Sequence, residues 1–140
     1  MSDLLLPFDN SPSALRALDH AVALAGGRPG TRVHLLGVLD EVGQDTRELI
    51  DAAEIERVLS AEASAMLDPA RVRLEAAGIL TTVHALTGVP ARVIADLARE
   101  QGVAQIVMGT RGLGPIPGLV LGSVASRVLQ LAQCPVTLVK

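Results

Sequence analysis

Glycines recur at a spacing that suits phosphate binding near the C-terminus. In the stretch GTRGLGPIPGLVLGSVASRV, Gly109 is followed after two residues by Gly112 and after nine more by Gly122 and Ser123, where a helical pattern begins. Glycines let the backbone turn tightly and point N–H groups into a concavity that binds anions. A helix N-terminus also presents free N–H groups at its positive end. The spacing therefore predicts a phosphate site in which Ser123 and Val124 donate backbone N–H groups.

Two charged side chains could add ligand contacts to these backbone groups. Arg111 lies inside the glycine motif, where its guanidinium could close over phosphates or extend into solvent. Asp9 follows an apolar run, and its carboxylate could bind a base or ribose or merely organise the DNSP turn. We favour a ligand role for Asp9. Because Phe8 is the single aromatic residue, a bound base would lie between aliphatic side chains such as Val38 and Met108.

Residue types that often catalyse reactions are present but are not grouped. His20, His34 and His84 fall in one predicted helix and two predicted strands, without the spacing of metal ligands, so we expect them to be structural. Cys134 is expected to be a small buried residue rather than a nucleophile. Ser123 lies in LGSVA, which lacks the GxSxG pattern of an activated serine. The sequence predicts no catalytic residues and no metal site.

The elements that must position these residues alternate along the whole chain. Strands are predicted at 4–8, 32–39, 81–86, 104–108 and 135–139. Helices are predicted at 12–26, 47–77 with a kink or restart at Asp68-Pro69, 90–102 and 123–133. The alternation predicts one domain, 1–140, folded as a three-layer α/β sandwich with a five-stranded parallel sheet and helices on both faces.

We prefer the Rossmann-like strand order 3-2-1-4-5. The chain then reverses direction between strands 1 and 4, and ligands bind beyond the carboxyl ends of these strands, where the DNS turn and the glycine motif lie. The flavodoxin-like order 2-1-3-4-5 stays open as an alternative. It would place the crevice beside TGVP (87–90), which offers little chemistry.

Composition limits the classes of function. The chain of 140 residues is 49% hydrophobic and 19% charged, as in a globular domain, and no apolar run reaches the roughly 20 residues of a membrane span. The start MSDLLLPFDN lacks the features of a secretory signal, and the single cysteine cannot form an internal disulfide, so we expect a cytoplasmic protein. No basic cluster or series of aromatic residues indicates nucleic-acid binding.

Charge is distributed unevenly along the chain. No Asp or Glu follows Glu100, whereas Arg111, Arg127 and Lys140 do. An anion bound there would meet no carboxylate repulsion. The same pattern also arises if this part of the chain is simply buried, and the sequence leaves both explanations open.

The chain resembles the universal stress protein family over its whole length, in particular the ATP-binding branch. LLLPFDNSPSALRALDHAVALA is similar to the family's first strand, Asp-[Gly/Asn]-Ser turn and first helix, VHLLGVLD to its second strand, and CPVTLVK to its last. The most specific match is Gly-x2-Gly-x9-Gly-[Ser/Thr]. The spacer LGPIPGLVL lacks the charged or hydroxyl side chain that many relatives carry, which leaves AMP or cyclic AMP as alternatives to ATP.

The resemblance implies an adenine nucleotide ligand and a regulatory or sensing function in the stress response, with at most slow ATP hydrolysis. Mg²⁺ or Mn²⁺ would arrive with the nucleotide. The implied contacts with adenine and ribose are Pro7, Phe8, Asp9 and Val38; those with ribose and phosphates are Met108, Gly109, Arg111 and Gly112; those with phosphate oxygens are Gly122, Ser123 and Val124.

The C-terminal strand is predicted to join two copies of the chain in a homodimer. PVTLV is apolar and would lie at an open sheet edge, which favours pairing with a second copy, and the family resemblance implies the same mode. Two alternative functions remain. One is a slow ATP hydrolase of the adenine nucleotide α-hydrolase-like group, against which the lack of acids after Glu100 argues. The other is a dimeric scaffold that binds no nucleotide.

Overall fold

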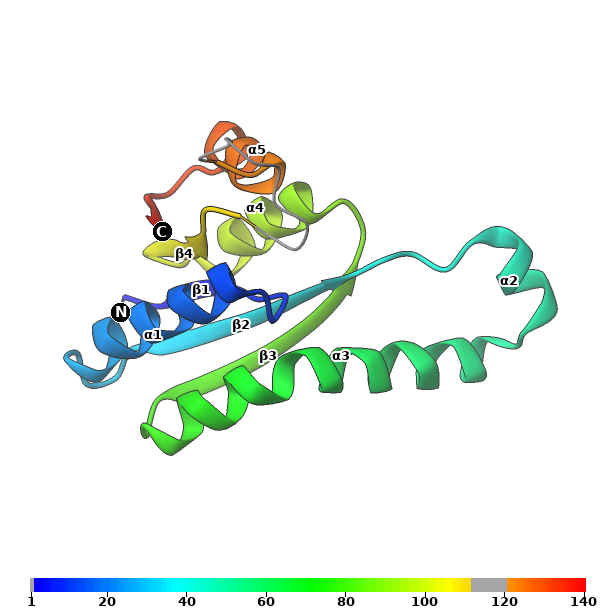
Figure 1. Ribbon diagram of the computed structural model, residues 1–140, viewed down its shortest axis with the longest axis horizontal. Helices are drawn as coiled ribbons and strands as arrows, with labels where there is room; N and C mark the ends of the chain where they lie inside the picture. Colours follow the sequence, from blue (N-terminus) through cyan, green and yellow to red (C-terminus); the bar gives the residue numbers. More distant parts are fainter. Residues whose placement is uncertain (1, 112–120) are drawn as a thin grey trace.

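The computed structural model describes residues 2–111 and 121–140 (Figure 1). Gly112 and most of the predicted spacer therefore lie outside the described residues. The elements in chain order are β1 (Leu4–Pro7), α1 (Pro12–Gly26), β2 (Arg32–Leu39), α2 (Gln44–Leu49), α3 (Ala52–Ala76), β3 (Leu80–Thr87), α4 (Pro90–Gln101), β4 (Gln105–Gly109), α5 (Ser123–Leu131) and β5 (Val136–Val139).

All five of these strands are parallel and lie in the order β3-β2-β1-β4-β5. This confirms the predicted order and shows that the flavodoxin-like alternative was wrong. β1 pairs with β2 on one side and β4 on the other, so the reversal in chain direction falls between β1 and β4. The carboxyl ends of β1 and β4 are therefore the place where this topology favours a ligand.

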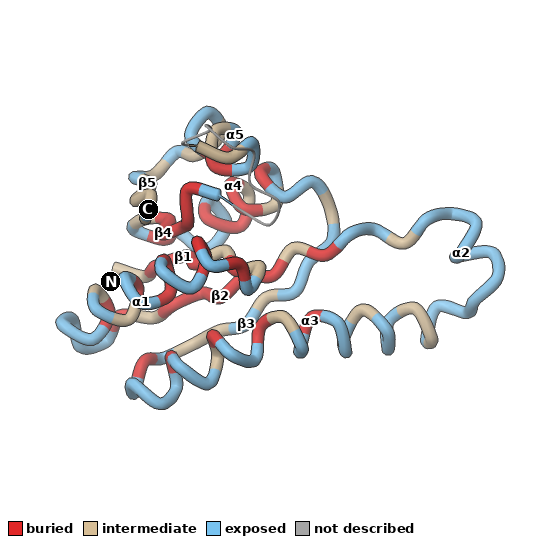
Figure 2. Tube along the Cα trace, viewed as in Figure 1, coloured by how far each residue is buried: buried red, intermediate tan, exposed pale blue. Residues whose placement is uncertain are grey.

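Helices cover both faces of the sheet, which confirms the three layers. Alternate strand residues point to opposite faces: Leu6 and Leu35 pack with residues of α1 and α3, whereas Leu5 and Leu36 pack with residues of α4 and α5. Figure 2 shows the buried residues gathered along β1, β2 and β4, while α2 and much of the outer surface of α3 are exposed. The core is thus centred on the strands that carry the candidate site.

Local signals explain where α1 and α4 begin and end. Ser11 caps α1, its Oγ accepting a hydrogen bond from Ala14 N at 3.1 Å, and Pro12 occupies the first turn, where no N–H is needed. α4 ends at Gly102, which has φ 61°. Glycine adopts this left-handed conformation without a steric penalty. Both helices lie where the sequence predicted them.

The predicted break within 47–77 was misplaced. The helical region is interrupted at Ile50, which is extended (φ −126°, ψ 140°), and α3 restarts with Asp51 as its cap, whose Oδ1 accepts from Glu54 N at 2.8 Å. Pro69 lies inside α3. Proline removes one helical hydrogen bond, but α3 packs on the sheet on both sides of it through residues such as Leu67 and Leu74. Tertiary packing therefore outweighs the local signal.

No helix within the described ranges has both the length and the apolar character needed to cross a bilayer.

Candidate functional site

The turn after β1 fixes the position of Asp9. Phe8 N donates to Leu36 O at 2.8 Å, continuing the pairing with β2. Asp9 Oδ1 then accepts a hydrogen bond from Ser11 N at 3.0 Å, and Asn10 between them has φ 62°, a conformation that asparagine tolerates. Asp9 Oδ2 accepts no hydrogen bond from the residues that the structure describes. One carboxylate oxygen thus organises the turn, and the other is available to a ligand.

Phe8 and Pro7 face different surroundings at this end of β1. The Phe8 ring is 3% exposed and packs in the core between the sheet and α1. Pro7 is half-buried. A ligand beyond β1 would therefore meet the backbone rather than the ring of Phe8.

Val38 and Met108 lie on one face of the sheet. Both belong to the apolar cluster that packs against α4 and α5, Met108 as a buried member and Val38 as a half-buried one at the end of β2. β1 separates their two strands. They belong to one apolar cluster at this end of the sheet.

Close contact with α1 shapes the end of β4. A Cβ added to Gly109 would come within 2.8 Å of the backbone carbonyl oxygen of Ser13. Arg111 N donates to Ser13 Oγ at 3.2 Å, while the Arg111 side chain is exposed. Gly109 is therefore required for packing between β4 and α1, a reason that the motif alone did not reveal.

The start of α5 is held beside the end of β4. Gly122 caps α5 with φ −71° and ψ 163°, and its N–H donates to Thr110 O at 2.6 Å. Thr110 N in turn donates to Val139 O at 3.1 Å. Ser123 and Val124 form the first turn of α5 and are exposed, and this turn contains no acidic residue. The N-terminus of α5 is thus placed at the carboxyl edge of the sheet.

The structure brings most of the predicted residues to one edge. Asp9 follows β1, Gly109 ends β4, and Gly122 opens α5, with Val38 at the end of β2. No group of three or more His, Cys, Asp or Glu side chains that could hold a metal occurs in the described part of the chain. The arrangement offers backbone donors, an apolar surface and the second carboxylate oxygen of Asp9.

The family model of the universal stress proteins matches residues 1–140. The chain belongs to this family. Among solved structures, that of MJ0577 from Methanocaldococcus jannaschii is similar to this universal stress protein domain with a TM-score of 0.87 and 29% identity, covering 99% of this chain and 95% of the other.

Two further universal stress protein structures contain nucleotides. One, in complex with cAMP, is 27% identical, with a TM-score of 0.74 and coverage of 99% of this chain and 97% of the other. The second, from Archaeoglobus fulgidus in complex with dAMP, is 26% identical, with a TM-score of 0.73 and coverage of 100% and 98%. Similar chains thus bind adenine nucleotides.

Sequence reasoning missed a histidine pair in this universal stress protein domain. His34 Nδ1 lies 3.0 Å from His84 Nε2, and His34 Nε2 lies 3.3 Å from Asp3 Oδ2. The strand register explains this contact. Leu36 of β2 pairs with His84 of β3, and His34, two residues before Leu36, points to the same face of the sheet as Leu36 and His84. Only the register of two strands 50 residues apart could have revealed this contact.

The carboxylate determines which ring nitrogens carry hydrogen. A carboxylate only accepts, so His34 Nε2–H donates to Asp3. In neutral His34 the Nδ1 atom then accepts from His84 Nε2–H. Burial, and then the neighbouring His34 ring, lower the pKa of His84 below its usual value of 6.5. Burial and the neighbouring ring thus favour neutral His84, and the hydrogen bonds connect Asp3, directly before β1, with β2 and β3.

Stability is expected to fall on mild acidification because of His84. Its pKa is lowered in the folded state, so the unfolded chain takes up the proton at a higher pH. This contribution is fully present above the usual value of 6.5 and is lost as the pH falls through it towards the folded-state pKa. Urea unfolding at pH 7.5 and 5.5 should show a smaller pH-dependent loss for His84→Gln than for the parent protein.

The matched control is His20→Gln, which removes an exposed imidazole from α1. We expect this variant to retain the pH dependence of the parent protein. An equal loss of stability in all three proteins would show that the pair does not respond to pH.

The sequence predicted a small buried residue at Cys134, and the structure shows it only partly buried. Burial raises the pKa of its thiol, an effect partly opposed by backbone hydrogen bonds. A raised pKa reduces the fraction of reactive thiolate.

Proposed function

We propose that this protein binds ATP or a related adenine nucleotide at the carboxyl edge of β1 and β4 and acts as a regulatory or sensing module in the stress response. One observation carries the proposal. The hydrogen bond from Gly122 N to Thr110 O holds the N-terminus of α5 against the end of β4. This places helix N–H donors at the reversal point of the sheet, where the topology favours a ligand.

Each predicted contact has a chemical role in this arrangement. Asp9 Oδ2 would accept hydrogen bonds from the ribose or base, and Val38 and Met108 would form the apolar surface beneath the adenine. Gly122, Ser123 and Val124 would bind phosphate oxygens through the backbone.

Within the first part of the glycine motif, Gly109 and Arg111 lie among the described residues, whereas Gly112 does not. Gly109 and the exposed Arg111 lie beside the phosphate position, so Arg111 can reach a phosphate without breaking an ion pair of the described residues. Gly112 keeps its predicted role, although it lies outside the described residues. The lack of acids after Glu100 leaves the local charge favourable to an anion.

Binding without fast turnover fits the chemistry at this edge. Asp9 is the carboxylate that the structure places at the exit of β1, and one of its oxygens is engaged by Ser11 N. A nucleotide-bound Mg²⁺ or Mn²⁺ would be held chiefly by the phosphates. We therefore propose at most slow hydrolysis of ATP. The relatives in complex with cAMP and dAMP support an adenine nucleotide with few phosphates as the alternative ligand.

Two measurements test the function directly. Protein purified from cells is denatured, and the released small molecules are separated by anion exchange, which identifies any carried nucleotide. Calorimetric titration of the stripped protein with ATP, AMP and cAMP then ranks their affinities. We expect one adenine nucleotide to bind with one site per chain. If none of the three bound and none was released, the dimeric scaffold would be the better explanation.

We also propose a homodimer formed through β5. β5 is an edge strand of four uncharged residues. The backbone groups of its odd-numbered residues point towards β4. Ile106 N donates to Pro135 O at 3.0 Å, and Thr110 N donates to Val139 O at 3.1 Å. The backbone groups of Val136 and Leu138 therefore point outward and are free to pair with a second copy.

Leu138→Pro is expected to convert the dimer to a monomer in sedimentation experiments. Proline removes the outward N–H without removing a bond to β4. Leu138→Ala is the matched control because it loses the same side-chain packing but keeps the N–H. A Pro variant that sediments as the parent dimer would show that β5 does not pair in this way.

A further inference from the structure

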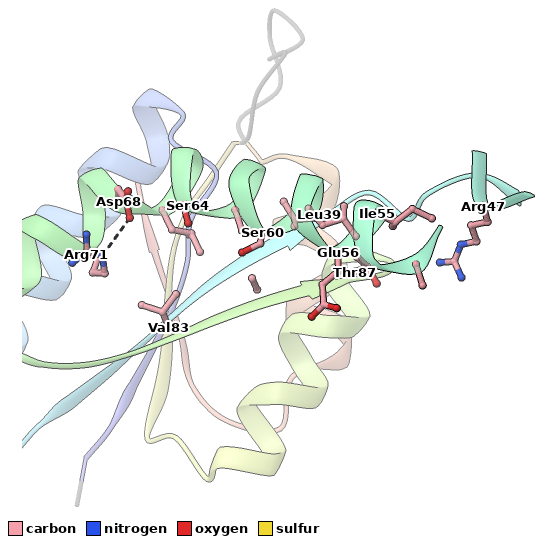
Figure 3. A pocket seen from close by; sticks show the side chains of 15 residues that line it. Leu39, Arg47, Ile55, Glu56, Ser60, Ser64, Asp68, Arg71, Val83 and Thr87 are labelled. Carbon is pink, nitrogen blue, oxygen red and sulfur yellow. Dashed lines mark hydrogen bonds and ion pairs between the residues drawn. The ribbon is translucent and has the colours of Figure 1, made fainter. Parts of the chain in front are cut away.

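A cavity opens between α3 and the sheet, apart from the proposed nucleotide site. It has a volume of about 800 Å³ and is lined mainly by residues of α3, together with Arg47 of α2, Leu39 at the end of β2, and Val83, Ala85 and Thr87 of β3 (Figure 3). Small-molecule sites typically measure roughly 300–1,000 Å³. None of the residues predicted to bind nucleotide lines this cavity.

The cavity exists because α3 contacts the sheet at one end and stands off from it at the other. At Gly37 of β2 the helix is so close that an added Cβ would lie 2.6 Å from Met66 Cε and 3.0 Å from Leu67 Cδ1. The cavity runs along α3 from Ala52 to Arg71, and its lining includes the small side chains of Ala63 and Ala85. The sequence thus builds both the contact and the opening.

Aliphatic side chains line much of the cavity. Ile55, Leu59 and Leu67 recur at helical spacing on the side of α3 that faces the strands, opposite Leu39 and Val83. Val83 is 43% exposed. These surfaces would be removed from water by an apolar molecule, which is favourable by roughly 25 cal/mol per Å². The chain's single aromatic side chain, Phe8, is not among the lining residues, so a ligand would be held by aliphatic contacts.

The charges of the lining residues balance. Arg71 pairs with Asp68 at 3.3 Å, and also with Glu75 at 3.0 Å. At the α2 end, Arg47 and Glu56 oppose one another in sign, and Arg47 Nε already donates to a backbone carbonyl. Neither an anion nor a cation is therefore favoured. The remaining polar groups of the lining are hydroxyls: Ser60, Ser64 and Thr87.

We propose that this cavity binds an uncharged, elongated apolar molecule that carries a hydroxyl or carbonyl group. The hydrocarbon body lies between α3 and the ends of β2 and β3, and the polar group forms a hydrogen bond with a lining hydroxyl. The protein would then hold two ligands of different chemistry, because the nucleotide site lies at the ends of β1 and β4.

The test uses Nile red, an uncharged apolar dye whose fluorescence rises in apolar surroundings, with the full-length protein. Ser64→Phe places a large side chain into the cavity from an exposed helical position. Ala65→Phe makes the same change on the adjacent residue, which is exposed and does not line the cavity. We expect saturable dye binding by the parent and by Ala65→Phe, and at least a tenfold loss of affinity in Ser64→Phe.

Competition defines the class of ligand. We expect 1-dodecanol to displace the dye at lower concentration than dodecanoate does. Preference for dodecanoate would overturn the uncharged assignment. Absence of saturable dye binding, or equal affinity in all three proteins, would overturn the site itself.

Two control measurements separate this inference from the other proposals. ATP titration of both variants should match the parent, since neither residue lies at the nucleotide site, so failure of one proposal is distinguishable from failure of the other. A change in the sedimentation of Ser64→Phe alone would instead show that the cavity lies at an interface between two copies of the chain.

Discussion

Gly109→Ala is expected to destabilise the protein by about 3 kcal/mol, the upper part of the range for forced overpacking, and to lower its melting temperature by roughly 10 °C. The added Cβ would lie 2.8 Å from both the carbonyl carbon and the carbonyl oxygen of Ser13. These are backbone atoms at the start of α1, so they cannot move aside as a flexible side chain does. β4 or α1 must shift, and both belong to the core of the fold.

Urea unfolding followed by circular dichroism measures this effect. Gly26→Ala is the matched control because Gly26 ends α1 and an added Cβ there meets nothing within 4 Å. We expect the control to be as stable as the parent or slightly more stable, since alanine favours helix over glycine by roughly 1 kcal/mol. Equal stability of the two variants would mean that the contact between Gly109 and Ser13 does not constrain the fold.

Gly122→Val is expected to weaken nucleotide binding at least about tenfold, or roughly 1.4 kcal/mol, while the fold persists. Gly122 has φ −71° and ψ 163°, an extended conformation that valine adopts readily. The loss would therefore come from the branched side chain occupying the place of the phosphate.

Calorimetric titration with ATP compares three variants with the parent. Gly43→Val is the matched control, since Gly43 caps α2 with φ −60° and ψ 152° and an added Cβ there meets nothing within 4 Å. It should bind ATP as the parent does. Ser123→Ala should lose less affinity than Gly122→Val because its backbone N–H survives. Unchanged affinity in a folded Gly122→Val would place the phosphates elsewhere.

Much of the fold could be predicted from local patterns. Apolar runs bounded by turn residues located the strands within two residues, and Ser11, Pro12 and Gly102 marked helix ends. These signals act over a few residues, so the chain shows them before it folds. The break between α2 and α3 was misplaced because the local effect of Pro69 is weaker than the packing of α3 on the sheet.

The candidate site was predictable only in part. The glycine spacing and the lack of acids after Glu100 identified which backbone segments could bind phosphate. The sequence did not reveal that Gly109 also allows β4 to approach Ser13, because these residues are far apart along the chain. It also left open whether Asp9 binds a ligand or organises its turn, and the structure shows the turn contact through Oδ1.

By itself, the sequence determined the alternation of strands and helices, the family and the chemical character of the glycine motif, because each depends on residues close together in the chain. Tertiary structure alone decided which distant groups meet. The register of β2 and β3 joins His34 to His84, and the packing of α3 against Gly37 holds this helix over the sheet beside the cavity. Such contacts depend on how whole elements pack, and packing is set by side chains from several segments at once.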